Sequence, residues 1–188
     1  CYCEQITPIE LKTKLSLLLF KKEIFLPSNT ALVTEKSLTN FEKHLRGFQD
    51  KQLSENFIDE KKYQPLYLFP TEDANELTPE LLCSFSKPIN LIVPDGTWRQ
   101  AKKVHRREPL LSHIPRVKIT PNQKSIYPLR RQKYEYGLCT HEAISYALGI
   151  IESPSIQNSL MNNLKVFINA HLKNRPIFEK EKGRVSPP

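Results

Sequence analysis

The sequence predicts an α/β fold, a single domain with a mostly parallel sheet and flanking helices. Short apolar segments at 15–20, 66–69 and 89–94 have the length and composition of buried strands. They alternate with segments of helical character, and this alternation builds parallel sheets that helices cover. Neither an internal repeat nor a change of composition divides the 188 residues, so one domain is expected over 1–188.

The strand at 15–20 is followed by a turn and a helix. Ser28 and Asn29 come directly after a proline, and their side chains are of the type that caps helices. A helix is therefore predicted to begin near Asn29 or Thr30.

The next part of the chain, residues 40–62, is polar and charged. Three apolar side chains in it recur at helical spacing: Phe41, Leu45 and Phe48. A helix or a loop is therefore expected to lead into the second strand, at 66–69.

The third strand, 89–94, is the clearest, because its sequence INLIVP is nearly all apolar. A basic helix follows at once, and Thr97 and Gln100 have the spacing of a capping box at its start. The narrow apolar stripe of this helix consists of Trp98, Ala101 and Val104. On this pattern Trp98 is expected to pack in the core.

The last part of the chain is expected to hold one more strand and two helices. Residues 116–120 alternate like a strand, and a long loop rich in proline and basic residues follows. Helices are predicted over 140–152 and from Pro154 onward, where a serine precedes a proline at the first helical position. Residues 178–188 are expected to form a flexible tail.

The composition excludes several classes of protein. Five glycines, no two of them within five residues of each other, rule out G-x-G-x-x-G and P-loop phosphate cradles. The longest apolar run, 17–20, is far shorter than the roughly 18 residues of a membrane span, so no membrane partner and a cytoplasmic location are expected. The net charge of +8 points to a polyanionic partner, most simply RNA. No obligate protein partner is evident.

The cysteines offer at most half of a metal site. Cys1 and Cys3 form a C-x-C pair, which supplies two of the four ligands of a structural zinc site. Cys83 and Cys139 have no partner at ligand or disulfide spacing and are expected to be small, semi-buried residues. The five histidines also lack ligand spacing and are expected to be ordinary surface or packing residues.

Asp95 is the leading candidate for chemistry, because ligands of parallel α/β sheets bind at the carboxyl ends of the strands. It follows the most apolar strand, and the neighbouring Gly96 lets the backbone approach a ligand closely. The alternative is that Asp95 only complements the dipole of the helix that follows it.

The basic helix and the long loop carry a second candidate site, an RNA-binding surface. Guanidinium groups hold phosphates and aromatic rings stack on bases, and the loop places arginines beside tyrosines. The alternative is an ordinary solvated face. The candidate RNA-binding residues are Lys102, Lys103, Arg106, Arg107, Ser125, Tyr127, Arg130 and Arg131.

Several short motifs follow one another in a recognisable order. They are Cys1-Tyr2-Cys3, Ser28-Asn29-Thr30 with Leu32, Asp95-Gly96-Thr97-Trp98 with the basic residues after it, 111–115, Ser125-Ile126-Tyr127-Pro128-Leu129-Arg130, and Leu138-Cys139-Thr140-His141-Glu142-Ala143. Together they resemble the DTW-domain family, the tRNA-uridine aminocarboxypropyltransferases. Ala31 and Cys139 stand where this family usually has glycine and serine. Residues 1–10 resemble the end of the family's N-terminal cysteine segment, whose upstream cysteines are absent, so a zinc site is not expected to be complete within this chain.

The resemblance implies a SPOUT-like fold in which a knot near the C-terminal half holds S-adenosylmethionine. It also implies transfer of the 3-amino-3-carboxypropyl group to N3 of a uridine in tRNA, with release of methylthioadenosine. Asp95 is the catalytic residue that the resemblance implies. The implied cofactor-binding residues are Ser28, Asn29, Thr30, Asp95, Gly96, Thr97, Trp98, Leu138, Cys139, Thr140 and Glu142.

The sequence leaves roles and alternatives open. Asp95 is either a general base for the uridine imide or the partner of the ammonium group of the transferred arm. Arg130 or Arg131 pairs with the carboxylate of the arm or with a tRNA phosphate. Glu142 has a purely structural alternative, as the acidic residue at a helix start. The alternative functions are a knotted-fold RNA methyltransferase and a non-catalytic RNA-binding module.

Overall fold

A parallel sheet forms the centre of the protein, in a computed structural model that describes residues 2–48, 53–54, 57–121, 123–130 and 137–173. Within these residues the sheet has six strands. Their order is β2 (Phe41–Arg46), β1 (Lys14–Phe20), β5 (Ile89–Asp95), β3 (Gln64–Leu68), β6 (Arg116–Lys118) and β4 (Asn75–Glu76). All neighbouring strands pair in parallel. The predicted α/β class and parallel sheet are thus confirmed.

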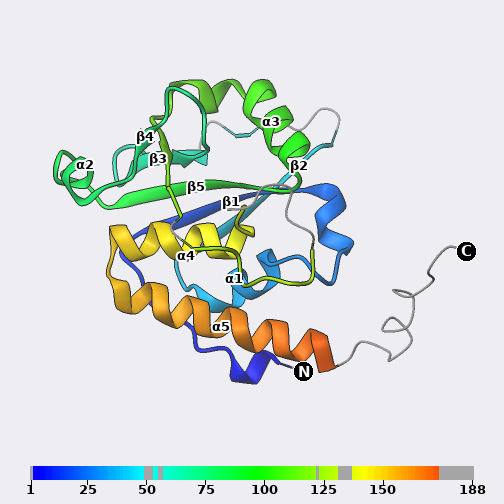
Figure 1. The fold of residues 1–188 in the computed structure, drawn as a ribbon. Helices are drawn as coiled ribbons and strands as arrows, with labels where there is room; N and C mark the ends of the chain where they lie inside the picture. Colours follow the sequence, from blue (N-terminus) through cyan, green and yellow to red (C-terminus); the bar gives the residue numbers. More distant parts are fainter. Residues whose placement is uncertain (1, 49–52, 55–56, 122, 131–136, 174–188) are drawn as a thin grey trace, which may run out of the picture.

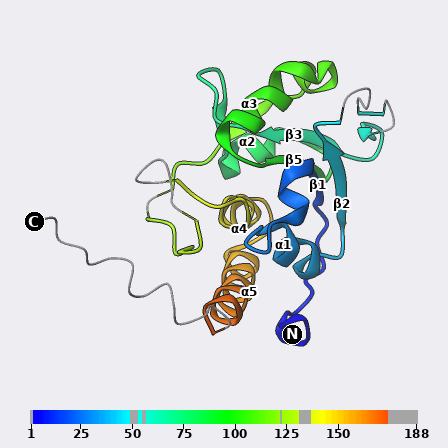
Figure 2. The same ribbon diagram turned by 90° about the vertical axis from the view of Figure 1, so that its right-hand side faces the viewer.

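Helices cover both faces of this sheet (Figures 1 and 2). One face carries α1 (Ala31–Ser37), α4 (Thr140–Ile151) and α5 (Pro154–Lys173). The other carries α3 (Trp98–Arg107) and the 3-10 helix η4 (Pro109–His113). The shorter elements are α2 (Pro79–Cys83) and the 3-10 helices η1 (Cys3–Gln5) and η2 (Lys21–Phe25).

The central strand β1 contributes to the core on both faces. Leu15, Leu17 and Leu19 pack with residues of α1, α4 and α5, whereas Leu18 and Phe20 pack on the side of α3. Successive side chains of a strand point to opposite faces, so a strand covered on both faces is nearly all apolar. The buried Ser16 is the exception, and its hydroxyl donates to Asn90 Oδ1 over 2.8 Å. Each fully buried leucine stabilises the fold by about 1.5–3 kcal/mol.

Residues 41–46 form the edge strand β2, so the prediction of a helix or a loop was wrong there. Phe41 pairs with Leu15, and the parallel register continues to Arg46, which pairs with Phe20. Leu45 is exposed, so the helical spacing does not mark a buried stripe. Pairing with β1, which the local sequence does not encode, determines this conformation.

The other predicted elements agree with the structure apart from their ends. The third strand, the capping box of α3 and both C-terminal helices are confirmed. The strand expected over 116–120 ends at Lys118, and neither β4 nor α2 was predicted. Cys139 is buried, whereas Cys83 is exposed rather than semi-buried.

Some expectations lie outside the described residues or stay untested. The tail at 178–188 is among the residues that the structure does not describe. The chain between the end of β6 and α4 includes 131–136, also outside the description, and the knot remains a prediction. The single-domain assignment of 1–188 remains a prediction too. No helix in the described ranges combines the length and apolarity that a bilayer crossing requires.

His141 is a fully buried histidine that joins α4 to α1 and α5. Its Nδ1 lies 2.8 Å from Thr34 Oγ1, and its Nε2 lies 2.9 Å from the carbonyl oxygen of Leu160. Burial lowers the pKa of His141 to about 4. The neutral ring is therefore part of the folded core at neutral pH.

Acid should destabilise the protein through this residue. Because the folded pKa is below the unfolded value of about 6.5, the unfolded chain binds more protons between these values. The free energy of unfolding should therefore fall by about 3 kcal/mol as the pH is lowered from about 6.5 to about 4. Urea denaturation across this window measures how the free energy of unfolding depends on pH. This dependence should be flatter in His141→Gln than in the wild type, and the exposed His113→Gln should resemble the wild type. Equal pH slopes in all three proteins would contradict this account.

Candidate functional site

The strands β1, β5, β3 and β6 end at one edge of the sheet, where the following segments enclose two adjoining pockets. This is the edge at which ligands of parallel α/β sheets bind. Four residues line both pockets: Gly96, Trp98, Leu138 and Thr140. The two pockets thus adjoin along a shared wall.

The first cavity, called the apolar pocket here, has a volume of about 410 Å³. It lies beyond the ends of β3, β5 and β6 and is closed by the start of α3 and the residues before α4. Apolar side chains dominate its lining, and its size suits a small-molecule ligand. Its lining residues are Leu68, Phe69, Pro70, Val93, Pro94, Gly96, Trp98, Ala101, Lys118, Ile119, Pro121, Gly137, Leu138, Thr140 and Ala143.

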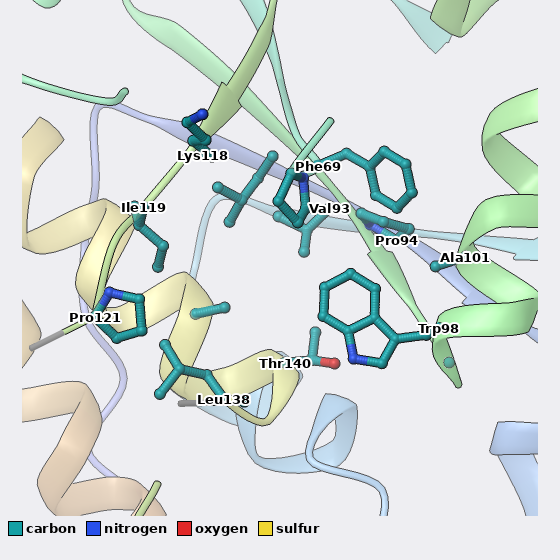
Figure 3. Close-up of a pocket in the computed structure, with 15 residues that line it drawn as sticks. Phe69, Val93, Pro94, Trp98, Ala101, Lys118, Ile119, Pro121, Leu138 and Thr140 are labelled. Atoms are coloured by element: carbon teal, nitrogen blue, oxygen red, sulfur yellow. The ribbon is translucent and has the colours of Figure 1, made fainter. Parts of the chain in front are cut away.

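Trp98 is a wall of this pocket. Figure 3 shows its ring reaching from the start of α3 toward Thr140, with Ile119 and Pro121 on the opposite side. The side chain is 38% exposed, so the prediction that Trp98 packs in the core was wrong. The other two residues of the apolar stripe, Ala101 and Val104, are buried.

The second cavity, called the polar pocket here, has a volume of about 350 Å³. Most of the residues that the sequence proposed for cofactor binding line it. They are joined by one of the predicted RNA-binding arginines. Its lining residues are Ser28, Asn29, Thr30, Asp95, Gly96, Thr97, Trp98, Arg99, Tyr127, Arg130, Leu138, Cys139 and Thr140.

Asp95 is the buried carboxylate of the polar pocket. Its Oδ1 accepts a hydrogen bond from the hydroxyl of Thr140, the first residue of α4. Its Oδ2 is buried and has no hydrogen-bond partner among the described residues. Burial raises the pKa of this carboxyl. The side chain bonds to α4 rather than to α3, so more than the dipole of the following helix determines its position.

Arg130 supplies the opposite charge. Its Nη1 donates to Glu23 Oε2 over 2.8 Å, and its Nε donates to Ser28 Oγ over 3.2 Å. Its Nη2 is buried without a hydrogen-bond partner in the described part of the chain. The polar pocket therefore presents one unpaired acceptor and one unpaired donor, on groups of opposite charge.

Glu23 was not among the predicted site residues. It lies on η2 and is buried, although lysines precede it in the sequence. Asn29 also holds this segment, because its Nδ2 donates to the Glu23 carbonyl oxygen over 3.1 Å. No motif in the sequence marks Glu23, since its burial depends on Arg130, 107 residues away.

Glu142 is a structural residue in the described site. It lines neither pocket, and its carboxylate accepts hydrogen bonds from Ser125 Oγ, Ile126 N and Cys139 N at 2.6, 2.7 and 2.8 Å. These contacts attach the loop at 123–130 to the start of α4. The side chain thereby helps to position Thr140, next to Cys139, and Arg130, which follows the attached loop residues Ser125 and Ile126.

Replacing Glu142 with glutamine should unfold the protein more easily. The amide cannot accept all three hydrogen bonds, and we expect a loss of about 3 kcal/mol in the free energy of unfolding. Urea denaturation measures this loss, with the exposed Glu60→Gln as the matched control. Equal stabilities of the two variants would show that the carboxylate does not hold the loop.

The remaining predicted residues divide into three groups. Lys102, Lys103, Arg106 and Arg107 are exposed on α3, as an RNA-binding surface requires. Tyr127 is only 3% exposed, and its hydroxyl donates to the Ser28 carbonyl oxygen, so its ring does not fit the expected role of a base-stacking platform. Cys1 and Arg131 lie outside the described residues.

The described residues contain no group of three or more His, Cys, Asp and Glu side chains that could hold a metal ion. Cys3 is exposed, and its expected partner Cys1 is not described. Burial raises the pKa of the Cys139 thiol well above its usual value, so this thiol stays protonated at neutral pH. Cys139 therefore lines the polar pocket as a small, protonated side chain.

Comparison with known proteins agrees with the motifs. A family model described as the DTW domain matches residues 1–172. The chain is 31% identical over 120 residues to tRNA-uridine aminocarboxypropyltransferase 2 from Drosophila melanogaster, which covers 63% of this chain and 47% of that protein. The protein of the same name from Macaca fascicularis is 32% identical over 114 residues, or 60% and 38% of the two chains. The chain thus spans less than half the length of these relatives.

One solved structure supports the fold. It is that of the SAM-dependent rRNA:acp-transferase Tsr3 from Vulcanisaeta distributa, with a TM-score of 0.53 and 22% sequence identity. The similarity covers 87% of this chain and 80% of that one.

Proposed function

Because this chain belongs to the DTW-domain family, we propose that it transfers the 3-amino-3-carboxypropyl group of S-adenosylmethionine to N3 of a uridine in tRNA. The second product of this reaction is methylthioadenosine. The curated relatives are named as tRNA-uridine aminocarboxypropyltransferases, and the proposal extends that activity to this chain.

The observation that carries the proposal is a pair of adjoining pockets, one apolar and one polar. The apolar pocket offers Trp98, Leu138 and proline rings, which suit the flat purine of an adenosine. The polar pocket offers Asp95 and Arg130, which suit the ammonium and carboxylate of an amino acid. S-Adenosylmethionine has both parts, with its sulfonium between them.

The unpaired polar atoms offer a partner for each of the two charged groups, which share the α-carbon at the far end of the arm. We place the ammonium group at Asp95 Oδ2 and the carboxylate at Arg130 Nη2, because each atom is buried without a partner among the described residues. Asp95, Glu23 and Arg130 carry a summed charge of −1 when both acids are ionised. The bound compound carries +1, so binding neutralises the site.

The chain's own residues then determine which carbon reacts. When bound, S-adenosylmethionine supplies a methylene carbon that bonds to uridine N3 as its bond to sulfur breaks and the electron pair goes to sulfur. Contacts to both charged groups of the α-carbon at one end, and to the adenosine at the other, hold this carbon in one orientation toward the incoming base. The proton of N3 passes to solvent water as the new bond forms. Shared wall residues, Trp98 and Thr140 among them, lie where the two pockets meet.

The exposed basic residues of α3 supply the tRNA contact in this proposal. Lys102, Lys103, Arg106 and Arg107 lie on the helix whose first turn lines both pockets. Phosphate contacts orient a nucleic acid without reading its sequence. This surface therefore directs the RNA toward the site and leaves the choice of uridine to other contacts.

The test uses S-adenosylmethionine labelled in the carboxypropyl arm, together with unmodified tRNA. We expect the label to enter the tRNA and to be recovered on a uridine after digestion. Label supplied in the methyl group should stay out of the RNA. Methyl label in the RNA would instead indicate a methyltransferase, and binding without transfer of either label would indicate a non-catalytic RNA-binding module.

A further inference from the structure

One side chain near the polar pocket is exposed at a cost that the fold does not explain. Phe25, the last residue of η2, is 82% exposed, and the residues on either side of it, Ile24 and Leu26, are exposed as well. Leaving a phenylalanine ring in water forgoes about 1.5–3 kcal/mol of burial free energy. An exposed apolar group of this kind indicates a binding surface.

The segment that carries Phe25 is attached to the polar pocket on both sides. Before it, the buried Glu23 pairs with Arg130. After it, Ser28 accepts a hydrogen bond from Arg130 and lines the pocket. Leu26 N donates to the Glu23 carbonyl oxygen, and Asn29 N donates to that of Leu26. These turns hold the tip of η2 in a fixed place beside the pocket.

The charges around Phe25 favour a polyanion. Lys21 and Lys22 belong to the same 3-10 helix, and Lys21 Nζ lies 5.1 Å from the centre of the Phe48 ring. The one acid of η2, Glu23, is buried and paired, so it does not oppose these cations. An exposed aromatic ring on the same short helix as two lysines suits unpaired nucleotides, by base stacking and phosphate contacts.

We propose that Phe25 stacks on an unpaired base next to the target uridine and thereby selects uridines in single-stranded parts of tRNA. This inference rests on the proposed function for the identity of the target base. Tyr127, the aromatic residue that the sequence offered for stacking, is buried, and Phe25 takes that role. Lys21 and Lys22 contact the adjoining phosphates.

The first test compares tRNA affinities at one fixed salt concentration. Phe25→Ala should bind unmodified tRNA about 10-fold more weakly, the lower part of the range for lost stacking on one base. Phe25→Trp should bind as well as the wild type, because it keeps a stacking ring. Leu172→Ala is the control, since Leu172 is 45% exposed at the end of α5. Affinity for S-adenosylmethionine should be equal in all four proteins.

The second test identifies the stacked base. A short single-stranded RNA with one central uridine is prepared with and without the base on each side of that uridine. Removing the correct base should weaken wild-type binding about 10-fold and should not weaken binding by Phe25→Ala further. Equal effects of base removal in both proteins, no effect of Phe25→Ala on tRNA affinity, or no wild-type binding to the short RNA would each overturn the inference.

Failure of this inference is distinguishable from failure of the proposed function. Binding is measured without transfer, so a protein that never labels tRNA still reveals whether Phe25 stacks. Conversely, the wild type could transfer the arm while Phe25→Ala binds tRNA as tightly as the wild type. That result would support the proposed function and refute the stacking role of Phe25.

Discussion

Asp95→Asn is expected to reduce transfer of the carboxypropyl arm at least about 100-fold while the protein stays folded. The amide keeps a group that accepts a hydrogen bond from Thr140, but it lacks the charge that pairs with the ammonium group of the arm. We therefore expect S-adenosylmethionine to bind about 30-fold more weakly, which corresponds to about 2 kcal/mol. Calorimetric titration measures the affinity, and the arm-label assay measures transfer.

Stability provides a control within the same variant. Because burial raises the folded pKa of Asp95, the free protein should lose stability as the pH rises through that pKa. Asp95→Asn has no such loss and should be at least as stable as the wild type at neutral pH. Asp95 would then lower the stability of the free protein while it contributes to cofactor binding, which is the usual trade-off between stability and function.

The outcomes separate the two roles that the sequence leaves open for Asp95. Weaker cofactor binding supports the ammonium partner. Unchanged affinity with slow transfer would assign Asp95 as the general base and contradict the ammonium assignment. Unchanged transfer would remove Asp95 from the site altogether. The exposed Asp59→Asn should behave as the wild type in both measurements.

Arg130→Gln is expected to affect both stability and transfer. Removing the guanidinium leaves the Glu23 carboxylate buried without its ion pair, and breaking a buried pair costs about 3 kcal/mol. It also removes the proposed partner of the arm's carboxylate. Transfer should therefore fall by about 100-fold or more, but a partly unfolded protein would give the same result.

The double variant Glu23→Gln with Arg130→Gln separates these causes. Without the Glu23 charge, no unpaired carboxylate remains, so most of the lost stability should return. Transfer should stay low, because the guanidinium that binds the arm is still absent. Recovery of transfer together with stability would show that Arg130 acts only through Glu23.

The sequence predicts the location of the candidate site at this edge of the sheet, because two independent patterns meet there. The apolar run of β5 places Asp95 at the end of a central strand, and the capping box of Thr97 and Gln100 starts α3 directly after it. Ligand position in a parallel sheet follows from topology alone. The same rule also applies to Leu68 and Lys118, which end neighbouring strands and line the apolar pocket.

The features that the sequence did not predict depend on contacts between distant segments. Phe41 and Leu45 have helical spacing, yet β2 is a strand because it pairs with β1. Glu23 follows two lysines, yet it is buried because Arg130 reaches it from another loop. The spacing of apolar residues indicates whether a segment favours a helix or a strand, but it does not show which distant segments contact each other in the fold.

Trp98 belongs to the apolar stripe of α3 but lines a pocket instead of packing in the core. Its spacing with Ala101 and Val104 indicates a buried helix face, and the two later residues are indeed buried. Trp98, however, lies in the first turn, past the edge of the sheet, where a cavity replaces the core. A stripe predicts burial only over the length of helix that the sheet covers.

The identity of the nucleoside released in a single turnover tests the central claim most directly. The claim is that the polar pocket holds the amino acid arm so that its methylene carbon, rather than the methyl group, faces the uridine. The protein is mixed with S-adenosylmethionine and excess unmodified tRNA, and the products are measured by mass spectrometry. Methylthioadenosine and modified uridine should form in equal amounts. Formation of adenosylhomocysteine and a methylated nucleotide in equal amounts would contradict this arrangement of the two pockets.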